Sequence, residues 1–360
     1  MSAAAGVLAL LCGPVAGAAA DPGQPPPSTG GSIGLRLLDA PRGREADPRA
    51  HMYIVDHLAP GAVIHRRLQV TNTSDTDQRV DLYAGSAEID NGTFTAEPDL
   101  TPNELTTWVS VDDCATQEAA SAAPGGCGTP RKDGAGGPPT PRPLVRHVPA
   151  HGAAVVEVSV RVPPKASAGE RYAVVWAQVA GPADQAGNVR VVNRVGVRLY
   201  LDVGPGGEPP SDFRIGEVTP ARAPDGTPEV VAVVRNTGAR ALDMTGSVSM
   251  TEGPGSLSAG PFSVNLGTTL GIGSAGRVTV LLDRQLPAGP WKVRLTLASG
   301  LVRHTVTATL TFPVGSAAGA PVTPDAADSA SMTPGVPAVA LAVVVVVAFG
   351  YGVVRRRRVS

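Results

Sequence analysis

The sequence predicts an all-β protein with two tandem immunoglobulin-like β-sandwich domains and a C-terminal single transmembrane helix. Three observations predict it. Apolar and polar residues alternate in many short runs, turn-forming residues separate the runs, and an uncharged apolar stretch with four following arginines lies near the end. The 360 residues suggest about two domains. A hydrophobic content of 42% and glycines without a three-residue period exclude wholesale disorder and collagen.

Residues 1–20 are predicted to be a signal peptide, because Ala3–Ala20 is a short run of small apolar residues with an A-x-A cleavage site at its end. An uncleaved anchor is the alternative. Residues 21–30 form a Pro-rich leader. We therefore expect an exported protein.

The first sandwich is predicted over residues 31–204, where strict two-residue periodicity recurs. Valines alternate with Glu, Ser and Arg over 156–162, and apolar residues alternate similarly over 195–201. One apolar and one polar face are typical of antiparallel strands that cover a core. The further strands expected here are Ile33–Leu38, Met52–Asp56, Ile64–Thr71, Gln78–Ala87, Thr107–Val111 and Tyr172–Val179. No convincing helix is expected.

A linker over residues 205–210, rich in Gly and Pro, separates this module from a second immunoglobulin-like sandwich over 211–313. The same alternation marks strands at 291–297 and 306–312. The two modules also resemble each other. Leu68–Ser74 is similar to Ala232–Gly238, and Ser167–Tyr172 is similar to Leu286–Trp291. Repeated sandwiches and convergent β patterning both explain this similarity.

The C-terminal part is predicted to be a flexible stalk (314–335), a transmembrane helix (336–354) and a basic cytoplasmic tail (355–360). The apolar stretch of 19 uncharged residues is long enough to span a bilayer. Since arginines remain on the cytoplasmic side, the expected localisation is single-pass in the cell membrane with the bulk of the chain extracellular.

Cys114 and Cys127 are predicted to form a disulfide, because they are the two cysteines left after removal of the signal peptide in an exported protein. They lie in an insertion over residues 112–143 that is rich in Gly, Pro and Ala. Zinc is a poor alternative, because no histidine pair lies nearby to complete a tetrahedral site.

No catalytic, cofactor-binding or metal-binding residues are predicted, so the protein is expected not to be an enzyme and to bind neither cofactor nor nucleic acid. Gly30–Gly34 matches a nucleophile elbow but follows a Pro-rich leader. Gly271–Gly276 matches a dinucleotide fingerprint, but a strand rather than a helix follows it. His147 and His151 have helical spacing that Pro149 forbids.

Three tryptophans could stack on sugars, as exposed aromatic rings do. Core packing is the better interpretation for Trp176 and Trp291, which lie in apolar stripes. Trp108 is left undetermined.

The first module resembles the N-terminal domain of the WxL-interacting protein family, catalogued as domain of unknown function 916. The similar stretches are Tyr53–Gly61, Leu68–Ser74, Ala87–Phe94 and Val162–Pro164. The order of signal peptide, two sandwiches, transmembrane helix and basic tail is also similar, as in a distant, actinobacterial-type member. The resemblance implies peptidoglycan binding by the first module and a protein partner for the second.

The sequence analysis thus favours a non-catalytic, membrane-anchored cell-surface protein. Its expected partner is peptidoglycan or another cell-surface protein, and its ligand-binding residues stay unknown. The alternative is a membrane-bound extracellular enzyme or an accessory subunit of an envelope complex, which a cluster of Ser, His and carboxylate side chains would favour.

Overall fold

The computed structural model describes residues 33–114, 143–183, 190–264 and 267–326. The predicted signal peptide (1–20), leader (21–30), transmembrane helix (336–354) and basic tail (355–360) lie outside the described residues. Within the described part of the chain, no helix is both long and apolar enough to cross a membrane.

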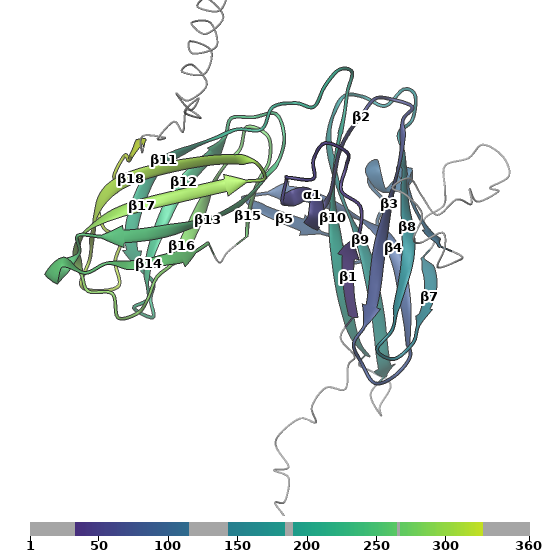
Figure 1. Ribbon diagram of the computed structural model, residues 1–360, viewed down its shortest axis with the longest axis horizontal. Coiled ribbons are helices and arrows are strands. Elements are labelled where there is room, and N and C mark those ends of the chain that lie inside the picture. Colours follow the sequence, from purple (N-terminus) through teal and green to yellow (C-terminus); the bar gives the residue numbers. More distant parts are fainter. Residues whose placement is uncertain (1–32, 115–142, 184–189, 265–266, 327–360) are drawn as a thin grey trace, which may run out of the picture.

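Two sheets form the first sandwich, on the right in Figure 1. The first sheet has the order β1 (Ile33–Leu37), β3 (Val63–Asn72), β8 (Ala153–Arg161) and β6 (Val109–Asp113). The second has the order β2 (Ile54–Leu58), β10 (Arg190–Val203), β9 (Gly169–Ala183), β4 (Gln78–Asp90) and β5 (Thr93–Ala96), with β7 (Leu144–Val148) also paired to β4. The chain therefore crosses from one sheet to the other between β1 and β2. The four-residue helix α1 (Arg49–Met52), which the sequence analysis did not expect, lies in this crossing.

Two more sheets form the second sandwich, on the left in Figure 1. Its smaller sheet has the order β11 (Phe213–Arg222), β12 (Pro228–Asn236) and β16 (Ala275–Leu281). Its larger sheet has the order β14 (Ala259–Ser263), β13 (Leu242–Thr251), β17 (Gly289–Ser299), β18 (Val302–Phe312) and β19 (Asp325–Ala326), with β15 (Thr268–Leu270) paired to β13. Short 3-10 turns occur at Leu105–Trp108 and Pro254–Ser256. The described chain is thus almost entirely β, as the alternation predicts.

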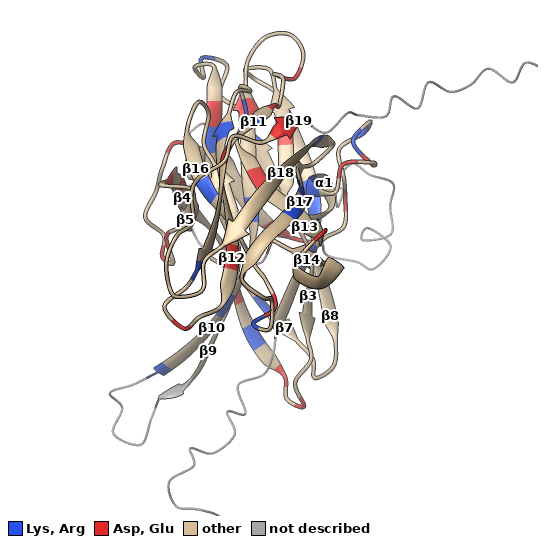
Figure 2. Ribbon diagram, turned by 90° about the vertical axis from the view of Figure 1, so that its left-hand side faces the viewer, with Lys and Arg blue, Asp and Glu red and all other residues tan. Residues whose placement is uncertain are grey.

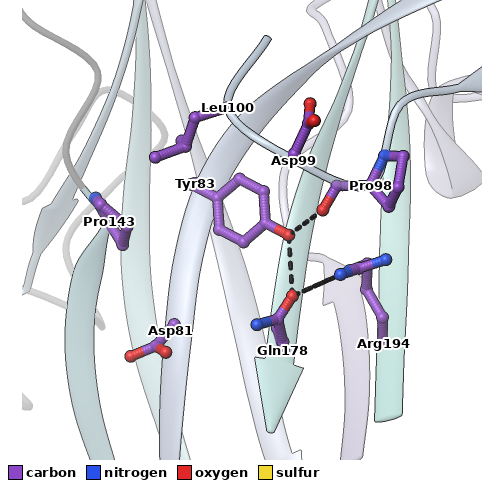
Figure 3. A pocket seen from close by; sticks show the side chains of 8 residues that line it. All are labelled: Asp81, Tyr83, Pro98, Asp99, Leu100, Pro143, Gln178 and Arg194. Atoms are coloured by element: carbon purple, nitrogen blue, oxygen red, sulfur yellow. Dashed lines mark hydrogen bonds between the residues drawn. The ribbon is translucent and has the colours of Figure 1, made fainter. Parts of the chain in front are cut away.

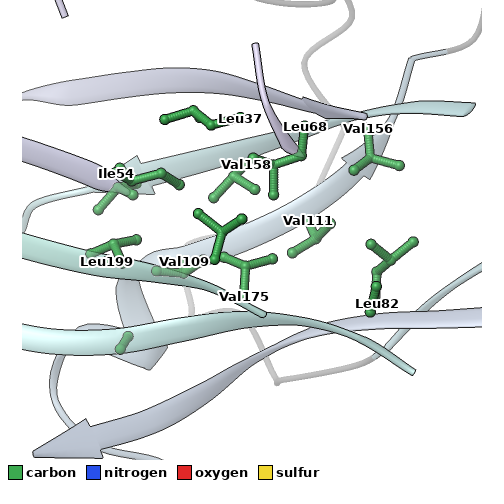
Figure 4. Close-up of a cluster of buried hydrophobic side chains, with 14 of the residues drawn as sticks. Leu37, Ile54, Leu68, Leu82, Val109, Val111, Val156, Val158, Val175 and Leu199 are labelled. Carbon is green, nitrogen blue, oxygen red and sulfur yellow. The ribbon is translucent and has the colours of Figure 1, made fainter. Parts of the chain in front are cut away.

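Each sandwich buries its own apolar core. In the first, Val156 and Val158 of β8 face Val175 of β9 and Leu199 of β10 across the two sheets (Figure 4). Burial of each such side chain contributes roughly 1.5–3 kcal/mol. The second core is built in the same way around Trp291.

The predictions for the tryptophans have different outcomes. Trp291 is fully buried in the second core, as predicted. The prediction for Trp176 was wrong, because its ring lies on the outer face of the second sheet of the first sandwich. There Gly85 and Gly196 on the neighbouring strands leave space for the indole, since a Cβ at either position would lie 2.7 Å from it. Trp108 is buried, with the Arg171 guanidinium 4.9 Å from its ring centroid.

The two sandwiches share local structure at the places where their sequences are similar. The buried Asn72 side-chain amide donates to the carbonyls of Thr76, Val148 and Pro149. The buried Asn236 amide donates likewise to Arg240, Leu270 and Gly271. In both, the side-chain oxygen accepts the N–H two residues on. Gly169 and Gly289, which begin β9 and β17, have φ values of 131° and 124°, open only to glycine at low cost.

Part of the segment predicted as a stalk pairs with the second sandwich. Residues 317–322 form main-chain hydrogen bonds with β11, and residues 325–326 pair with β18. This segment therefore closes one side of that sandwich.

Candidate functional site

The outer edge of β10 is only partly covered by a neighbouring strand. On one side β10 pairs with β9 along its whole length. On the other side β2 pairs, in parallel, with Leu199–Val203 only. Among the described residues, no strand lies beside residues 190–198 on that side. We call this nine-residue stretch the β10 edge.

The β10 edge carries apolar side chains that meet solvent. Val191 is 64% exposed and Val192 is 42% exposed. Val195 is partly buried against the core, and Val197 is buried within it. Figure 2 shows the β9–β10 hairpin extending beyond the neighbouring strands. An unpaired row of main-chain groups beside exposed valines is a template for strand pairing.

A network of side chains holds the outer face of this hairpin. Arg194 of β10 donates to the Gln178 side-chain oxygen on β9 at 2.6 and 3.0 Å. Tyr83 of β4 donates to the same oxygen at 2.9 Å and to the Pro98 carbonyl at 2.7 Å. Burial raises the pKa of Tyr83, so its hydroxyl remains a donor. These groups line a shallow pocket of about 450 Å³ (Figure 3), where they are bonded to one another. On the outer face of the sheet, these hydrogen bonds hold the β10 edge against β9 and β4.

A buried polar cluster joins the two sandwiches near Leu199, where β2 begins to pair with β10. Asp243 of β13 accepts hydrogen bonds from Arg49 of α1, and from Arg198 and Tyr200 of β10, at 2.8–3.0 Å. Thr269 of β15 donates to it at 2.9 Å. Burial, followed by the nearby Asp243 charge, raises the pKa of Tyr200, which therefore stays protonated.

A second set of charges extends this junction. The buried Arg240 guanidinium contacts Glu208, which also contacts Arg44. Burial lowers the pKa of Arg240 to about 10, so it remains a cation at neutral pH. Burial also raises the pKa of Glu170, whose carboxylate accepts the Ala241 N–H at 2.7 Å. These contacts join the second sandwich to the first near the end of β10 that β2 covers.

A cluster of Ser, His and carboxylate side chains lies on the outer face of the other sheet, in β3 and β8. Ser159 Oγ and Glu157 Oε1 each lie 2.9 Å from His65 Nδ1. In a catalytic triad the serine and the carboxylate engage opposite ring nitrogens, so that the ring takes the proton from one and is held by the other. Because both contacts here use Nδ1, this cluster is not a triad.

The other sequence motifs lie apart from the β10 edge. Of the stretch Gly271–Gly276, residues 271–274 form the turn between β15 and β16 and the last two residues begin β16, so that a strand follows the turn as predicted. His147 belongs to β7, and His151, in the following turn, contacts Asp75 at 2.9 Å. Cys114 is buried just after β6. Its predicted partner Cys127 lies outside the described residues, so the disulfide stays a prediction.

No known family profile and no curated protein matches the chain. Solved structures do. The Pseudomonas aeruginosa CupB2 chaperone is 14% identical with a TM-score of 0.33, over 73% of this chain and 99% of the chaperone. The E. coli chaperone DraB is 12% identical with a TM-score of 0.34, over 82% and 98%. The Salmonella enterica structure of the SafA pilin with the SafB chaperone gives 10% identity and a TM-score of 0.34, over 76% and 95%.

These findings correct several predictions. The resemblance to the WxL-interacting proteins was wrong, because no such profile matches and the solved structures named above are of chaperones. The predicted function and partners, a membrane-anchored protein that binds peptidoglycan or a surface protein, are overturned by the same comparison. The predicted single-pass membrane localisation is overturned with them. The expectation of a non-enzyme stays a prediction.

The β10 edge was not predicted as a site from the sequence. The strand itself was predicted correctly from the alternation over 195–201, but pairing partners leave no mark in that alternation. The exposed pair Val191-Val192 was the available signal, because it breaks the alternation before the strand enters the core.

Proposed function

We propose that this protein binds an extended segment of another polypeptide, which adds as a strand along the β10 edge. The observation that carries the proposal is the edge itself, nine residues with a paired neighbour on one side and none described on the other. Such strand addition obtains affinity from main-chain hydrogen bonds and selectivity from alternate side chains.

The surroundings of the edge support this function. The Arg194–Gln178–Tyr83 network keeps the strand in place before a partner arrives, which lowers the ordering cost of binding. The exposed valines offer apolar contacts to alternate side chains of the incoming strand. The protein would then be a chaperone-like binding protein whose ligand is a polypeptide.

The length of the site limits the ligand. β2 begins opposite Leu199, so an added strand must end there. At about 3.3 Å per residue, residues 190–198 accommodate an extended segment of roughly nine residues. We expect a ligand with β-branched residues at alternate positions, because those pack well on a pleated surface.

The test uses a synthetic nine-residue peptide of alternating Val and Thr, with a proline-interrupted version as the peptide control. We expect the alternating peptide to slow amide hydrogen exchange within residues 190–198, and the proline version to leave it unchanged. Val192→Glu should weaken binding about tenfold, which corresponds to about 1.4 kcal/mol.

The matched control is Val233→Glu on β12, because Val233 is 41% exposed and Val192 is 42% exposed. This variant should bind the peptide as the wild type does. Equal weakening by both substitutions, or protection outside 190–198 alone, would contradict the proposal.

A further inference from the structure

The second sandwich has its own strand-accepting channel, between β11 and β18. The main chain of residues 317–322 fills it, and we call this segment the strap. The Val218 and Val322 main chains exchange two hydrogen bonds of 2.9 Å. The Gly319 N–H donates to the Pro220 carbonyl at 2.7 Å, and the Arg222 N–H donates to the Ala317 carbonyl at 2.9 Å.

The channel restricts which residue type fits at two positions of the strap. A Cβ at Gly319 would lie 2.9 Å from both the Pro220 ring and the Thr311 carbonyl oxygen, so the channel admits only glycine there without a shift. Three residues later, Val322 packs against the second core. The channel therefore recognises the pattern Gly-x-x-Val in an extended chain.

The rest of the strap is held by main-chain hydrogen bonds and by few side-chain contacts. Most of its side chains are exposed, and Val322 is its one residue that packs on the core. The bridges Ala221–Ala318 and Val218–Val322 enclose one more residue on the strap than on β11, so the pairing contains a bulge. Few buried apolar contacts and exposed main-chain bonds are the features of a segment that opens locally.

The connection to the strap can extend. Val314, at the start of this connection, is 91% exposed. Arg222 fixes the preceding residue by donating to the Pro313 carbonyl at 2.8 Å. Beyond Pro313, only a 3.4 Å hydrogen bond from the Ser316 hydroxyl to the Pro224 carbonyl is seen for this connection among the described residues. The strap, together with the two-residue β19 pairing that follows it, can therefore leave while the rest of β18 stays paired with β17.

We propose that the channel between β11 and β18 accepts the strap of a second copy of this chain, so that two copies exchange straps. The channel binds residues 317–322 of its own chain through main-chain hydrogen bonds, and a second copy carries the identical segment. Exchange of an identical element preserves every contact of the strap, which makes it a low-cost route to a dimer. This inference does not depend on strand addition at the β10 edge.

The test is a pair of cysteines at Val218→Cys and Val322→Cys in the full chain, oxidised over a range of protein concentrations. The two residues exchange both main-chain bonds, a pairing with Cα atoms about 5.5 Å apart, within the range for a disulfide. A strap in its own channel gives a covalent monomer, and an exchanged strap gives a covalent dimer. We expect the ratio of dimer to monomer to rise about tenfold for each tenfold rise in concentration while the dimer is the minor species.

The matched control is Val233→Cys with Arg277→Cys, a directly paired position of β12 and β16 that no strap exchange reaches. It should give monomer alone at every concentration. Gly319→Val added to the first pair should abolish both products, and Ala320→Val should leave both. Covalent monomer alone at all concentrations, or an unchanged dimer with Gly319→Val, would overturn the proposal.

Discussion

The two sandwiches differ in how much of an outer strand edge is covered by another segment of the chain. In the first, β2 covers the last five residues of β10 and leaves residues 190–198 without a described neighbour. In the second, the strap follows the outer edge of β11. Pro321 and Pro324 lie in and just after the strap, and proline cannot donate to a further strand. Two modules of the same plan thus differ in whether an outer edge is covered by the chain itself, and the proposed strand addition at the β10 edge rests on this difference.

The largest expected effect concerns the cluster that joins the two sandwiches. Asp243→Ala leaves the buried Arg49 without its carboxylate and should destabilise the protein by about 3–5 kcal/mol. Denaturant unfolding measures this loss, and X-ray scattering should show that the particle expands.

The control is Asp225→Ala, because its ion pair with Arg284 is exposed and screened by solvent, so its loss should leave the stability nearly unchanged. Equal losses in the two variants would mean that the cluster does not hold the sandwiches together.

The next effect compares equivalent residues of the two sandwiches. Asn72→Ala and Asn236→Ala each remove a side chain that satisfies three carbonyls and one N–H. Each should cost about 2 kcal/mol, because buried carbonyls then lose their partners. Thermal unfolding of both variants provides the measurement. A difference of more than about twofold would show that the two asparagines are not equivalent.

The smallest effect depends on pH. Burial alone would raise the pKa of Asp39, but hydrogen bonds from the Arg67 side chain and main chain outweigh it and lower the pKa. A carboxylate with a lowered pKa adds stability above its unfolded pKa of about 3.9, and this stability is lost as the pH falls through the folded value.

Asp39→Asn should therefore reduce stability at pH 7, and its difference from the wild type should shrink below about pH 4. Urea unfolding at several pH values checks this. A difference that stays constant from pH 7 to pH 3 would contradict the assigned role of Asp39.

Much of the fold could be predicted from the sequence because strands that cover a core on one side alternate visibly. The runs at 195–201, 291–297 and 306–312 lie within observed strands, and the run at 156–162 extends one residue beyond the end of β8. The two Asn-initiated turns were also visible, since each turn uses the same short stretch of residues.

The rest depends on contacts between distant residues. In β9 the alternation separates Val174 and Trp176 from Val175 and Ala177, but both sets are apolar, so the pattern does not tell which set faces the core. The strap has a composition typical of a flexible segment, yet main-chain pairing needs no particular side chains. Asp243 and Arg49 are 194 residues apart, and no local pattern connects them.

Amide hydrogen exchange of the free, full-length protein tests the central contrast most directly. We expect the outward-facing amides of residues 190–198 to exchange at rates close to those of an unfolded chain. The amides of Val218, Arg222 and Val322, which donate within the strap pairing, should be clearly protected. Equal protection of all residues 190–198 and the strap contacts, or fast exchange at Val218 and Arg222, would contradict an open edge on the first sandwich and a closed one on the second.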